Sequence, residues 1–516
     1  MKVTQVSIIP SEQAALAGRP ALTPELLAAT GARYSRNNEG LDSIIANIDF
    51  GNRDEVMSSV AEWMLEQSER HDQGDCEFND LVIAFDEHAQ RIRQIRDAKL
   101  DKGVDSIFKM VDYGHASIAD MAPVAIFIDG ISIFAAYYLW SICPVASGQE
   151  SSTRYIKQNA SGLVSPHVLG IPEHLHEEWE KEMLKAFELY QKALEFWEKL
   201  AQENPEITKI PKSLLESTDE KDKKKVDRML RNYAFDRARV YLPVAAATNV
   251  MMIQSARAWA STASYLQSTP WPELVTLGEN IAKEMALATP RLLKHTKPTE
   301  STKLVLIDEI NNWKDMILDI LLYPLELEHG VGSAANPKAN IRISAPPLTK
   351  SEFQKALVHR TNRYSLVGSA LERTWVTFWW DAVAMAEIRD LNRHRTGNKY
   401  CPLVPVGFYA ALDQIPEGVN DNDMIEAAFW GRNASLDAAE MLIHGSYHYI
   451  YWTYLGTQFP FEHQTTADKF IYEMELRTGI GSHYRYAKHC FDMLELFYEE
   501  FPELKGLVLE GTAEPE

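Results

Sequence analysis

The chain has 516 residues, more than the roughly 250 to 300 at which a single hydrophobic core stops growing, so we expect at least two domains. With 46% hydrophobic and 24% charged residues, its composition is that of an ordinary globular protein. The formal net charge of −21 argues against general nucleic-acid binding and against a membrane-surface role, because phosphate groups would be repelled over most of the surface.

The cysteine count and the N-terminus bear on the cell compartment. The chain has four cysteines without Cys-x-x-Cys spacing, too few to staple a protein of this size. Residues 1–12 lack a basic start followed by an apolar run, so no targeting segment is expected. We therefore expect a protein of the reducing cytoplasm.

The first hundred residues are charged and predicted to be mostly helical, and their pattern assigns no function. The apolar segment Met121–Trp140 is the first element that the pattern predicts clearly. We expect a buried strand over Val124–Ile128, a turn at Asp129-Gly130 and a helix over Ile131–Trp140. These interruptions argue against a membrane span.

The stretch Ser147-Gly-Gln-Glu-Ser-Ser-Thr-Arg-Tyr155 gathers a carboxylate, hydroxyls and a guanidinium within nine residues. It has the composition of an anion-binding loop, because Arg154 offers a planar fork of donors and Ser151 and Ser152 can donate beside it. A phosphate would repel Glu150, so we expect this carboxylate to reach another group, such as a ribose hydroxyl. The alternative is a polar turn whose Ser and Thr residues cap a helix.

Helices are predicted after this loop. Apolar residues recur every three or four positions from Leu175 to Trp197, which indicates an amphipathic helix with one buried face. Further along, Pro243 should end a helix or fix a turn, because proline cannot continue a helix. Arg237 and Arg239 would then lie at that helix end.

Residues 323–348 carry the clearest boundary, because glycines and prolines there break any regular element. Thr349 and Glu352 then supply a capping box for a new helix. We predict a first unit over residues 1–322, a linker over 323–348 and a second unit over 349–516.

The second unit repeats the order of the first. A long apolar segment, Leu371–Leu391, runs into a dense polar cluster, Arg393–Tyr400, as Met121–Trp140 runs into the loop after it. Both units later carry a Pro-containing segment and a helix with arginine. This order indicates a diverged internal duplication.

Several motifs resemble those of the flavin-dependent thymidylate synthases. Arg393-His394-Arg395 resembles the Arg-His-Arg that opens the signature of that family. The signature continues as Ser-x-(Asn or Gln)-Glu-x-Ser-x-Arg-Tyr, and the stretch Ser147–Tyr155 is similar to this second part, although it lies in the other unit.

Further motifs extend the resemblance to residues 31–295 and 350–498. In the first unit, Gly114-His115-x-Ser117-x-x-Asp120 resembles Gly-His-x-(Ser or Thr)-x-x-Glu, and Arg239-x-x-Leu242-Pro243 resembles Arg-x-x-Leu-Pro. Arg257 resembles the arginine of Asn-x-Arg, with Ser255 in place of Asn. In the second unit, Leu476-Arg477 before Ser482-His483 resembles a late Leu-Arg segment.

The two units lack complementary parts of the pattern. The first unit has Ile142-Cys143-Pro144 where Arg-His-Arg should stand, and no arginine near Leu266, where its late arginine should fall. After Arg395 the second unit is too short for the Glu-x-Ser-x-Arg loop, and Gly456 replaces the arginine expected before Phe459-Pro460.

The resemblance implies reductive methylation of dUMP to dTMP, in which FAD carries the hydride, methylenetetrahydrofolate supplies the carbon and NADPH reduces the flavin. This chemistry needs arginines that hold a phosphate and polarise the uracil ring, and it needs no cysteine nucleophile. Arg477 and Arg393 are the implied catalytic residues. For Arg477 the alternative is a surface ion pair with Glu473 or Glu475.

The remaining implied roles divide between nucleotide and cofactor. The resemblance assigns nucleotide binding to Glu150, Ser151, Ser152, Arg154, Arg239 and Arg393, and flavin binding to His115, Ser117, Asp120, Arg257, Arg393, His394 and Arg395. No metal site is expected, because the histidines near the C-terminus lack convincing ligand spacing.

The family builds each site across subunits of a homotetramer, and the surviving residues of this chain sort between its units along the same division. We therefore expect composite sites shared between the units, in a chain that forms a homodimer. The implied fold is a duplicated, helix-rich α+β unit of the thymidylate-synthase-complementing-protein type, with small sheets flanked by long helices, the second unit being the more helical. A non-catalytic flavin- or nucleotide-binding relative and a methylase of another nucleotide remain alternatives.

Overall fold

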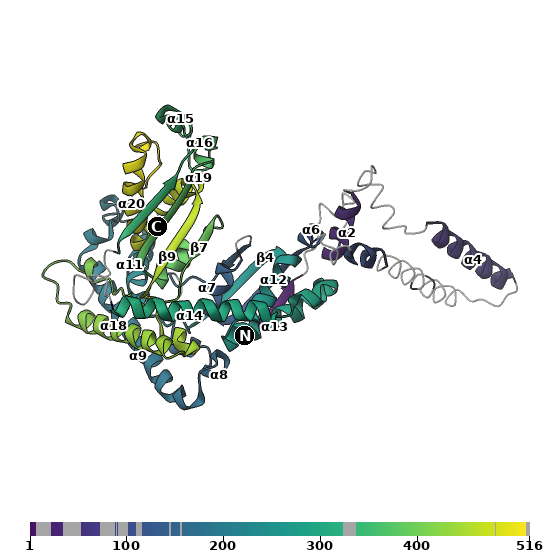
Figure 1. Cartoon of the computed structure of the whole chain (residues 1–516), viewed down its shortest axis with the longest axis horizontal. Helices are drawn as coiled ribbons and strands as arrows, with labels where there is room; N and C mark the ends of the chain where they lie inside the picture. Colours follow the sequence, from purple (N-terminus) through teal and green to yellow (C-terminus); the bar gives the residue numbers. More distant parts are fainter. Residues whose placement is uncertain are drawn as a thin grey trace.

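Two antiparallel sheets organise the chain in the computed structural model (Figure 1). The structure describes residues 1–6, 22–34, 53–72, 88, 90, 102–109, 116–143, 146–154, 157–322, 337–479 and 481–511. The α+β class with small sheets and many helices is as the sequence predicts.

The first unit carries a four-stranded sheet in the order β1-β2-β4-β3. Its strands are β1 (Lys2–Val6), β2 (Pro123–Ser132), β3 (Ser147–Glu150) and β4 (Ala247–Ser255). Its helices are α2 (Pro24–Tyr34), α4 (Arg53–Asp72), α6 (Ser117–Asp120), α7 (Ile133–Ser141), α8 (Pro166–Leu169), α9 (His176–Glu203), α10 (Lys212–Leu215), α11 (Glu220–Ala238), the 3-10 helix η4 (Arg239–Tyr241), α12 (Ala256–Leu266), α13 (Pro272–Ala288) and α14 (Glu300–Leu322).

The second unit carries the order β5-β6-β9-β7, with β8 paired to β9. Its strands are β5 (Ala339–Ser344), β6 (Trp375–Ala384), β7 (Asn398–Tyr400), β8 (Gly407–Phe408) and β9 (Thr457–Thr466). Its helices are α15 (Lys350–Lys355), α16 (Ser369–Glu372), α17 (Met385–Leu391), α18 (Asn422–Ile443), the 3-10 helix η8 (Tyr447–Trp452), α19 (Ala467–Arg477) and α20 (Tyr484–Glu500).

The two units have the same succession of elements. In each, a short helix precedes a long strand with a bulge, a helix and a short edge strand follow, and a second long strand leads into another helix. The strand orders 1-2-4-3 and 5-6-9-7 correspond one to one. This shared topology supports the duplication that the sequence suggests.

Backbone hydrogen bonds fix which residues correspond. The N–H of Phe134 donates to the carbonyl of Val244 at 3.0 Å, and the N–H of Ala386 donates to the carbonyl of Leu455 at 2.8 Å. Phe134 therefore corresponds to Ala386, and Val244 to Leu455. Further pairs of corresponding residues are found by counting forward along α7 and α17, or backward along the chain from β4 and β9.

Corresponding segments also contact each other directly. The N–H of Val244 donates to the carbonyl of Thr453 at 3.1 Å, and the N–H of Leu455 donates to the carbonyl of Leu242 at 2.9 Å. By the correspondence above, these two hydrogen bonds are equivalent. Such a contact is isologous, the kind that a two-fold axis generates between identical subunits. The units of one chain therefore pack as a pseudo-dimer.

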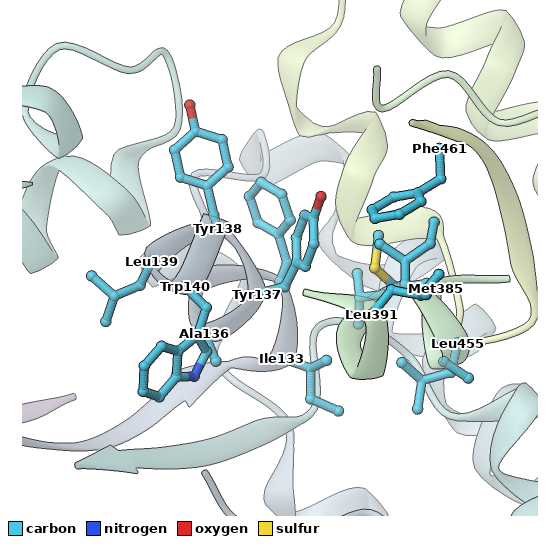
Figure 2. Close-up of a cluster of buried hydrophobic side chains, with 14 of the residues drawn as sticks. Ile133, Ala136, Tyr137, Tyr138, Leu139, Trp140, Met385, Leu391, Leu455 and Phe461 are labelled. Carbon is cyan, nitrogen blue, oxygen red and sulfur yellow. The ribbon is translucent and has the colours of Figure 1, made fainter. Parts of the chain in front are cut away.

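One core of buried residues runs through both units. Figure 2 shows its centre, where side chains of α7, including Tyr137, approach Met385 and Leu391 of α17. The indole N–H of Trp179 in the first unit donates to the carbonyl of Tyr451 in the second at 2.9 Å. In Figure 1 the long helix α14 runs beside both units, whereas α4 stands apart from them.

The structure corrects three details of the expected elements. The strand after Met121 does not end at Asp129-Gly130, because β2 continues through a bulge there, with Gly130 at a φ of 70°. The helix α7 begins only after Ser132, whose hydroxyl caps it by accepting from the N–H of Ala135 at 2.9 Å. Part of the expected linker 323–348 forms β5, while residues 323–336 lie outside the described ranges. Among the described residues the second unit is not the more helical, because its long helices are α18 and α20, whereas the first unit has α4, α9, α11, α13 and α14.

Other expectations are confirmed. The amphipathic stretch from Leu175 to Trp197 lies largely within α9. Thr349 and Glu352 form the capping box of α15, with the Glu352 N–H donating to the Thr349 hydroxyl at 3.3 Å. Within the described ranges, each helix is too short or too polar to span a bilayer.

Candidate active site

Arginines from both units converge on the buried carboxylate of Asp390 in α17. Arg239 from η4 lies 3.4 Å from this carboxylate and Arg393 lies 3.5 Å from it. Arg477, at the end of α19, donates to the backbone carbonyl of Asp390 at 3.5 Å. Burial alone would raise the pKa of Asp390, but Arg393, Arg239, Arg477 and Arg154 hold this pKa well below its usual range. We refer to these four arginines as the arginine cluster.

Arg154 follows the edge strand β3 and is bound in two-pronged geometry by Asp236 at the end of α11. Its Nε and Nη2 atoms each donate to one carboxylate oxygen at 2.7 Å, and Nη1 donates to the carbonyl of Gly481 in the second unit at 3.0 Å. Burial raises the pKa of Asp236, but Arg154 and His483 outweigh it and hold the pKa at about 2. Both groups of this pair are therefore charged at neutral pH.

The stretch around Arg154 is not a helix cap. Ser147–Glu150 is a strand, and the hydroxyl of Ser152 accepts from the N–H of Arg154 at 3.2 Å in a tight turn. The alternative that Ser and Thr residues cap a helix here is therefore wrong. Tyr155 lies outside the described residues.

Glu150 reaches another group, as the sequence suggests, but in the structure that group is an arginine of the second unit. Its carboxylate forms a nearly buried ion pair with Arg389 of α17, and the two side chains are 7% and 5% exposed. Arg389 also donates to the hydroxyl of Thr153 at 3.4 Å. These contacts join the loop of the first unit to the helix that carries Asp390.

Arg477 is held by a histidine rather than by a surface acid. Its Nε–H donates to Nε2 of His394 at 2.8 Å, so His394 is neutral and carries its proton on Nδ1. Burial lowers the pKa of His394 to about 3. Glu475 binds Arg360 instead, through bonds of 2.8 and 2.6 Å. The surface ion pair considered for Arg477 is therefore wrong.

A buried acid lies behind this pair. The carboxylate of Glu473 is 3.9 Å from Nε2 of His394 and 3.2 Å from Nδ1 of His463, and the hydroxyl of Tyr486 donates to it at 3.2 Å. Burial raises its pKa, but His394 and His463 hold the pKa at about 2. Glu473 therefore places a fixed negative charge beneath the Arg477–His394 contact.

A cavity of about 820 Å³ opens in the first unit, and its walls come mainly from the end of α7, from β4 and from α12. Arg257 and Asp120 line it and form an exposed ion pair of 2.9 Å, and the hydroxyl of Ser255 donates to Asp120 at 3.2 Å. Ser117, the first residue of α6, is exposed and does not line this cavity. His115 lies outside the described residues.

Arg395 of the second unit lies close to one wall of this cavity without lining it. Its guanidinium stacks on Trp140 of the first unit at 3.9 Å and donates to the carbonyl of Asn392 at 2.8 Å. It also lies near Cys143, a residue of the cavity wall whose thiol pKa burial raises to about 11 against the lowering influence of Arg395. Of the residues expected to bind a cofactor, Asp120 and Arg257 line this cavity, whereas Arg393, His394 and Arg395 do not.

One expected correspondence is wrong. Phe459-Pro460 lies inside β9, and Pro460 falls at the bulge opposite β6, where a ladder N–H is not needed. The true counterpart of Leu242-Pro243 is Thr453-Tyr454, so the position of Arg239 is taken in the second unit by Ile450 rather than Gly456.

Sequence analysis missed the carboxylates that hold the arginines. Asp236 and Asp390 each stand three residues before an arginine of the cluster, in Asp236-Arg-Ala-Arg239 and Asp390-Leu-Asn-Arg393. This repeated Asp-x-x-Arg spacing places the aspartate and the arginine on one helix face, and it is the feature of the sequence that could have indicated these carboxylates. Among the described residues, no group of His, Cys, Asp and Glu side chains is arranged to hold a metal ion.

Residues 52–291 match the family model of the thymidylate synthase complementing proteins. The resemblance to that family is confirmed for the motifs within these residues. The second unit lies outside the matched residues.

Comparison with single proteins adds little. No curated protein sequence matches the chain. Among the solved structures that match is the crystal structure of the UMP/dUMP methylase PolB from Streptomyces cacaoi bound with 5-Br dUMP, which is 16% identical and covers 40% of this chain and 86% of that chain. Its TM-score of 0.25 is too low to bear on fold or function.

Proposed function

We propose that the chain is a flavin-dependent methylase that converts dUMP to dTMP at a composite site formed by both units. The observation that carries this proposal is the arginine cluster, in which Arg239, Arg393 and Arg477 contact Asp390, and Arg154 adds its positive charge from the first unit. The cluster lies in a chain whose residues 52–291 match the family model of the thymidylate synthase complementing proteins.

The nucleotide phosphate would bind on the first-unit side of the cluster. Arg154 and Arg239 supply charged donors, and Ser151 and Ser152 supply hydroxyls beside them. Asp236 already occupies the fork of Arg154, so a phosphate must either displace this carboxylate or take the remaining donors. Arg393 is 44% exposed and is free to turn toward a ligand.

The pyrimidine ring would lie on the second-unit side. Arg477 can stabilise the negative charge that develops at N3 and O4 when C5 is activated, because its guanidinium remains charged throughout. His394 is neutral and accepts from Arg477, so it orients the guanidinium without competing for it as an anion would. Arg393 would assist on the same side of the ring.

The cavity of about 820 Å³ fits a dinucleotide cofactor in size and in its donors. Arg257 and the hydroxyls of Ser255 and Thr262 suit phosphate and ribose groups. Arg395 of the second unit lies near Cys143, which is part of the cavity wall. Bound reduced FAD would supply the hydride, methylenetetrahydrofolate the one-carbon unit, and NADPH would reduce the flavin. The chain's own part is to hold these molecules against the arginine cluster and to keep water away.

A non-catalytic flavin- or nucleotide-binding protein is the second candidate. The observation that favours it is that Asp236 and Asp390 engage the arginines internally, as in a site that no longer binds a phosphate. Cys143 and Ser255 also depart from the family pattern. Such a protein would bind flavin or nucleotide without turnover.

A single preparation separates these candidates. The purified chain is measured for oxidised-flavin absorbance, for dUMP binding by calorimetry, and for dTMP formation with methylenetetrahydrofolate and NADPH. We expect about one flavin per chain and dTMP as product. Bound flavin without any dTMP, together with failure to support a thymidine-requiring host, would establish the second candidate instead. We also propose a homodimer, which light scattering tests.

A further inference from the structure

The pseudo-two-fold relation between the units defines a second place equivalent to the arginine cluster. Counting from Phe134 and Ala386, Tyr137 corresponds to Arg389 and Tyr138 to Asp390. The second place therefore lies beside α7 and faces the edge strand β7, as the arginine cluster lies beside α17 and faces β3.

The residues at the second place make contacts equivalent to those beside the arginine cluster, but with uncharged groups. Glu150 pairs with Val250 in the first sheet, and Cys401 follows Tyr400 to stand at the corresponding position beside β9. The Cys401 thiol lies beside the Tyr137 hydroxyl, whose pKa is raised first by burial and then by this thiol. A tyrosine–cysteine contact thus replaces the Arg389–Glu150 ion pair.

The other charges of the cluster are lost in the same way. Leu266 stands where α19 has Arg477, Ile450 stands where η4 has Arg239, and Ile142 and Cys143 follow α7 where the Arg-His-Arg residues follow α17. A phosphate at the second place would therefore meet none of the guanidinium groups that the arginine cluster supplies.

The second place is nevertheless hollow. A cavity of about 160 Å³ lies there, and its walls are aromatic side chains from both units: Tyr137, Tyr138, Tyr265, Trp313 and Phe461. Polar groups also reach it, from Asn392, Lys399 and Glu309. Glu309 and Trp313 come from α14, which leaves the first unit and runs beside the second.

The charged groups of this cavity do not favour an anion. The ammonium group of Lys399 donates to the carbonyls of His394 and Thr396, so its charge is already compensated by protein dipoles. The Glu309 carboxylate would repel a phosphate. The tyrosine hydroxyls, the Asn392 amide and Glu309 can instead bond the donors and acceptors on the edge of a neutral ring.

We propose that this cavity binds one uncharged, planar six-membered heteroaromatic ring, of the class of a free pyrimidine base. Its volume is close to that of a cavity that holds a single benzene, about 150 Å³. Aromatic walls favour stacking or edge contacts with such a ring. Ser141, Ile142 and Tyr265 line both this cavity and the cavity of about 820 Å³, so the proposed site adjoins the proposed cofactor site, but ring binding there does not require turnover.

The test titrates the full chain with uracil by calorimetry, in the presence and absence of dUMP. We expect saturable binding at one site per chain that persists when dUMP is present, and that Arg154→Ala leaves unchanged. Absence of saturable uracil binding would overturn the proposal and mark the second place as a sealed relic. Uracil binding that dUMP displaces and Arg154→Ala weakens would place the base in the arginine cluster and equally overturn it.

Two variants locate the bound ring. Cys401→Phe fills the cavity and should reduce uracil affinity at least about 10-fold, whereas the matched Cys401→Ser should leave it within about 2-fold. Should Cys401→Phe fail to fold, Glu309→Trp obstructs the cavity from the half-exposed helix α14 and should give the same loss. Normal uracil binding in a folded filling variant would contradict the assignment. A crystal structure with 5-bromouracil then places the bromine directly, whether or not dUMP is a substrate.

Discussion

Leu266 and Arg477 occupy the same position in the two units: each is the last residue of an 11-residue helix that follows the long inner strand of its sheet. Of these two residues, only Arg477 contacts His394 and the backbone carbonyl of Asp390. The chain therefore keeps this guanidinium on one side of its pseudo-two-fold axis. One complete arginine cluster per chain follows, rather than two.

Replacing Arg477 should strongly lower turnover while leaving the flavin in place. In Arg477→Ala we expect kcat to fall by about 10²- to 10³-fold, the usual cost of removing one donor that stabilises charge in a transition state. The measurement is dTMP formation at saturating dUMP, together with the flavin content of the purified variant. Arg432→Ala, which removes an exposed arginine from α18, is the matched control. Unchanged kcat in Arg477→Ala would remove this residue from the chemistry.

Replacing Arg154 should weaken both nucleotide binding and folding. We expect Arg154→Ala to cost about 2 to 3 kcal/mol in dUMP binding, because a charge-assisted contact to the phosphate is lost. The sequence alone suggests that folding barely changes, but the structure shows that the variant leaves Asp236 buried without its partner. A loss of unfolding free energy of the same order, about 2 to 3 kcal/mol, should follow.

A double variant separates these two effects of Arg154. Arg154→Ala with Asp236→Asn removes the orphaned charge, so most of the stability should return while dUMP affinity stays low. Urea unfolding and calorimetry measure the two quantities on the same samples. Recovery of dUMP affinity in the double variant would mean that Asp236 repulsion, rather than a lost phosphate contact, explains the single variant.

The order of elements was readable from the sequence, but the partners of the arginines were not. Apolar segments such as Met121–Trp140 and Leu371–Leu391 each predict a strand followed by a helix, because their periodicity and length are local properties. The contact between Glu150 and Arg389 joins residues far apart in the chain, and nothing local in either one indicates it. Charged residues identify candidates for a site, and only the packing of the two units decides which of them meet.

The expected second-unit proline motif failed for a related reason. Phe459-Pro460 looks like Leu242-Pro243 as a pair of residue types, but Pro460 is tolerated within β9 because it falls at a bulge. The backbone contacts between Leu242 and Leu455 show the true correspondence. A short motif that contains proline therefore predicts a break in hydrogen bonding and leaves open which kind of break it is.

Buried neutral histidines should make the protein less stable in mild acid. Burial and then Arg239 lower the pKa of His483 to about 3 from its ordinary value of 6.5. Between these values the unfolded chain binds a proton that the folded chain does not, so the stabilisation is complete above pH 6.5 and is lost as the pH falls. One such histidine contributes about 1.4 kcal/mol of change between pH 7.5 and pH 5.5.

The pH effect is measured by urea unfolding of the wild type and of His483→Gln at both pH values. The loss of unfolding free energy on acidification should be smaller by about 1.4 kcal/mol in the variant. Other groups that titrate in this range, such as Glu387, whose pKa burial raises to about 7, cancel in the comparison. Equal losses in both proteins would mean that His483 is protonated or solvated in the folded state.

The composite site can be tested by mixing two impaired chains and assaying them at a dUMP concentration well below KM. In the structure, Arg154 donates to the carbonyl of Gly481 and Arg477 to the carbonyl of Asp390, so both lie against the second unit of the same chain. A mixed assembly of an Arg154→Ala chain and an Arg477→Ala chain therefore contains no complete cluster, and co-expressing the two differently tagged variants should restore no dTMP synthesis. If instead each site were shared between chains, as in a tetramer of single units, some of the mixed sites would be intact. Activity of up to about a quarter of the wild-type level should then return, since each site in a random mixture draws its two sides independently.

The double variant Arg154→Ala/Arg477→Ala sets the background activity of this experiment. Its activity should be about that of the less active single variant, because the two residues act on one bound nucleotide and their effects do not add. Recovery above that background in the purified mixed dimer would show that the two sides of the site come from different chains.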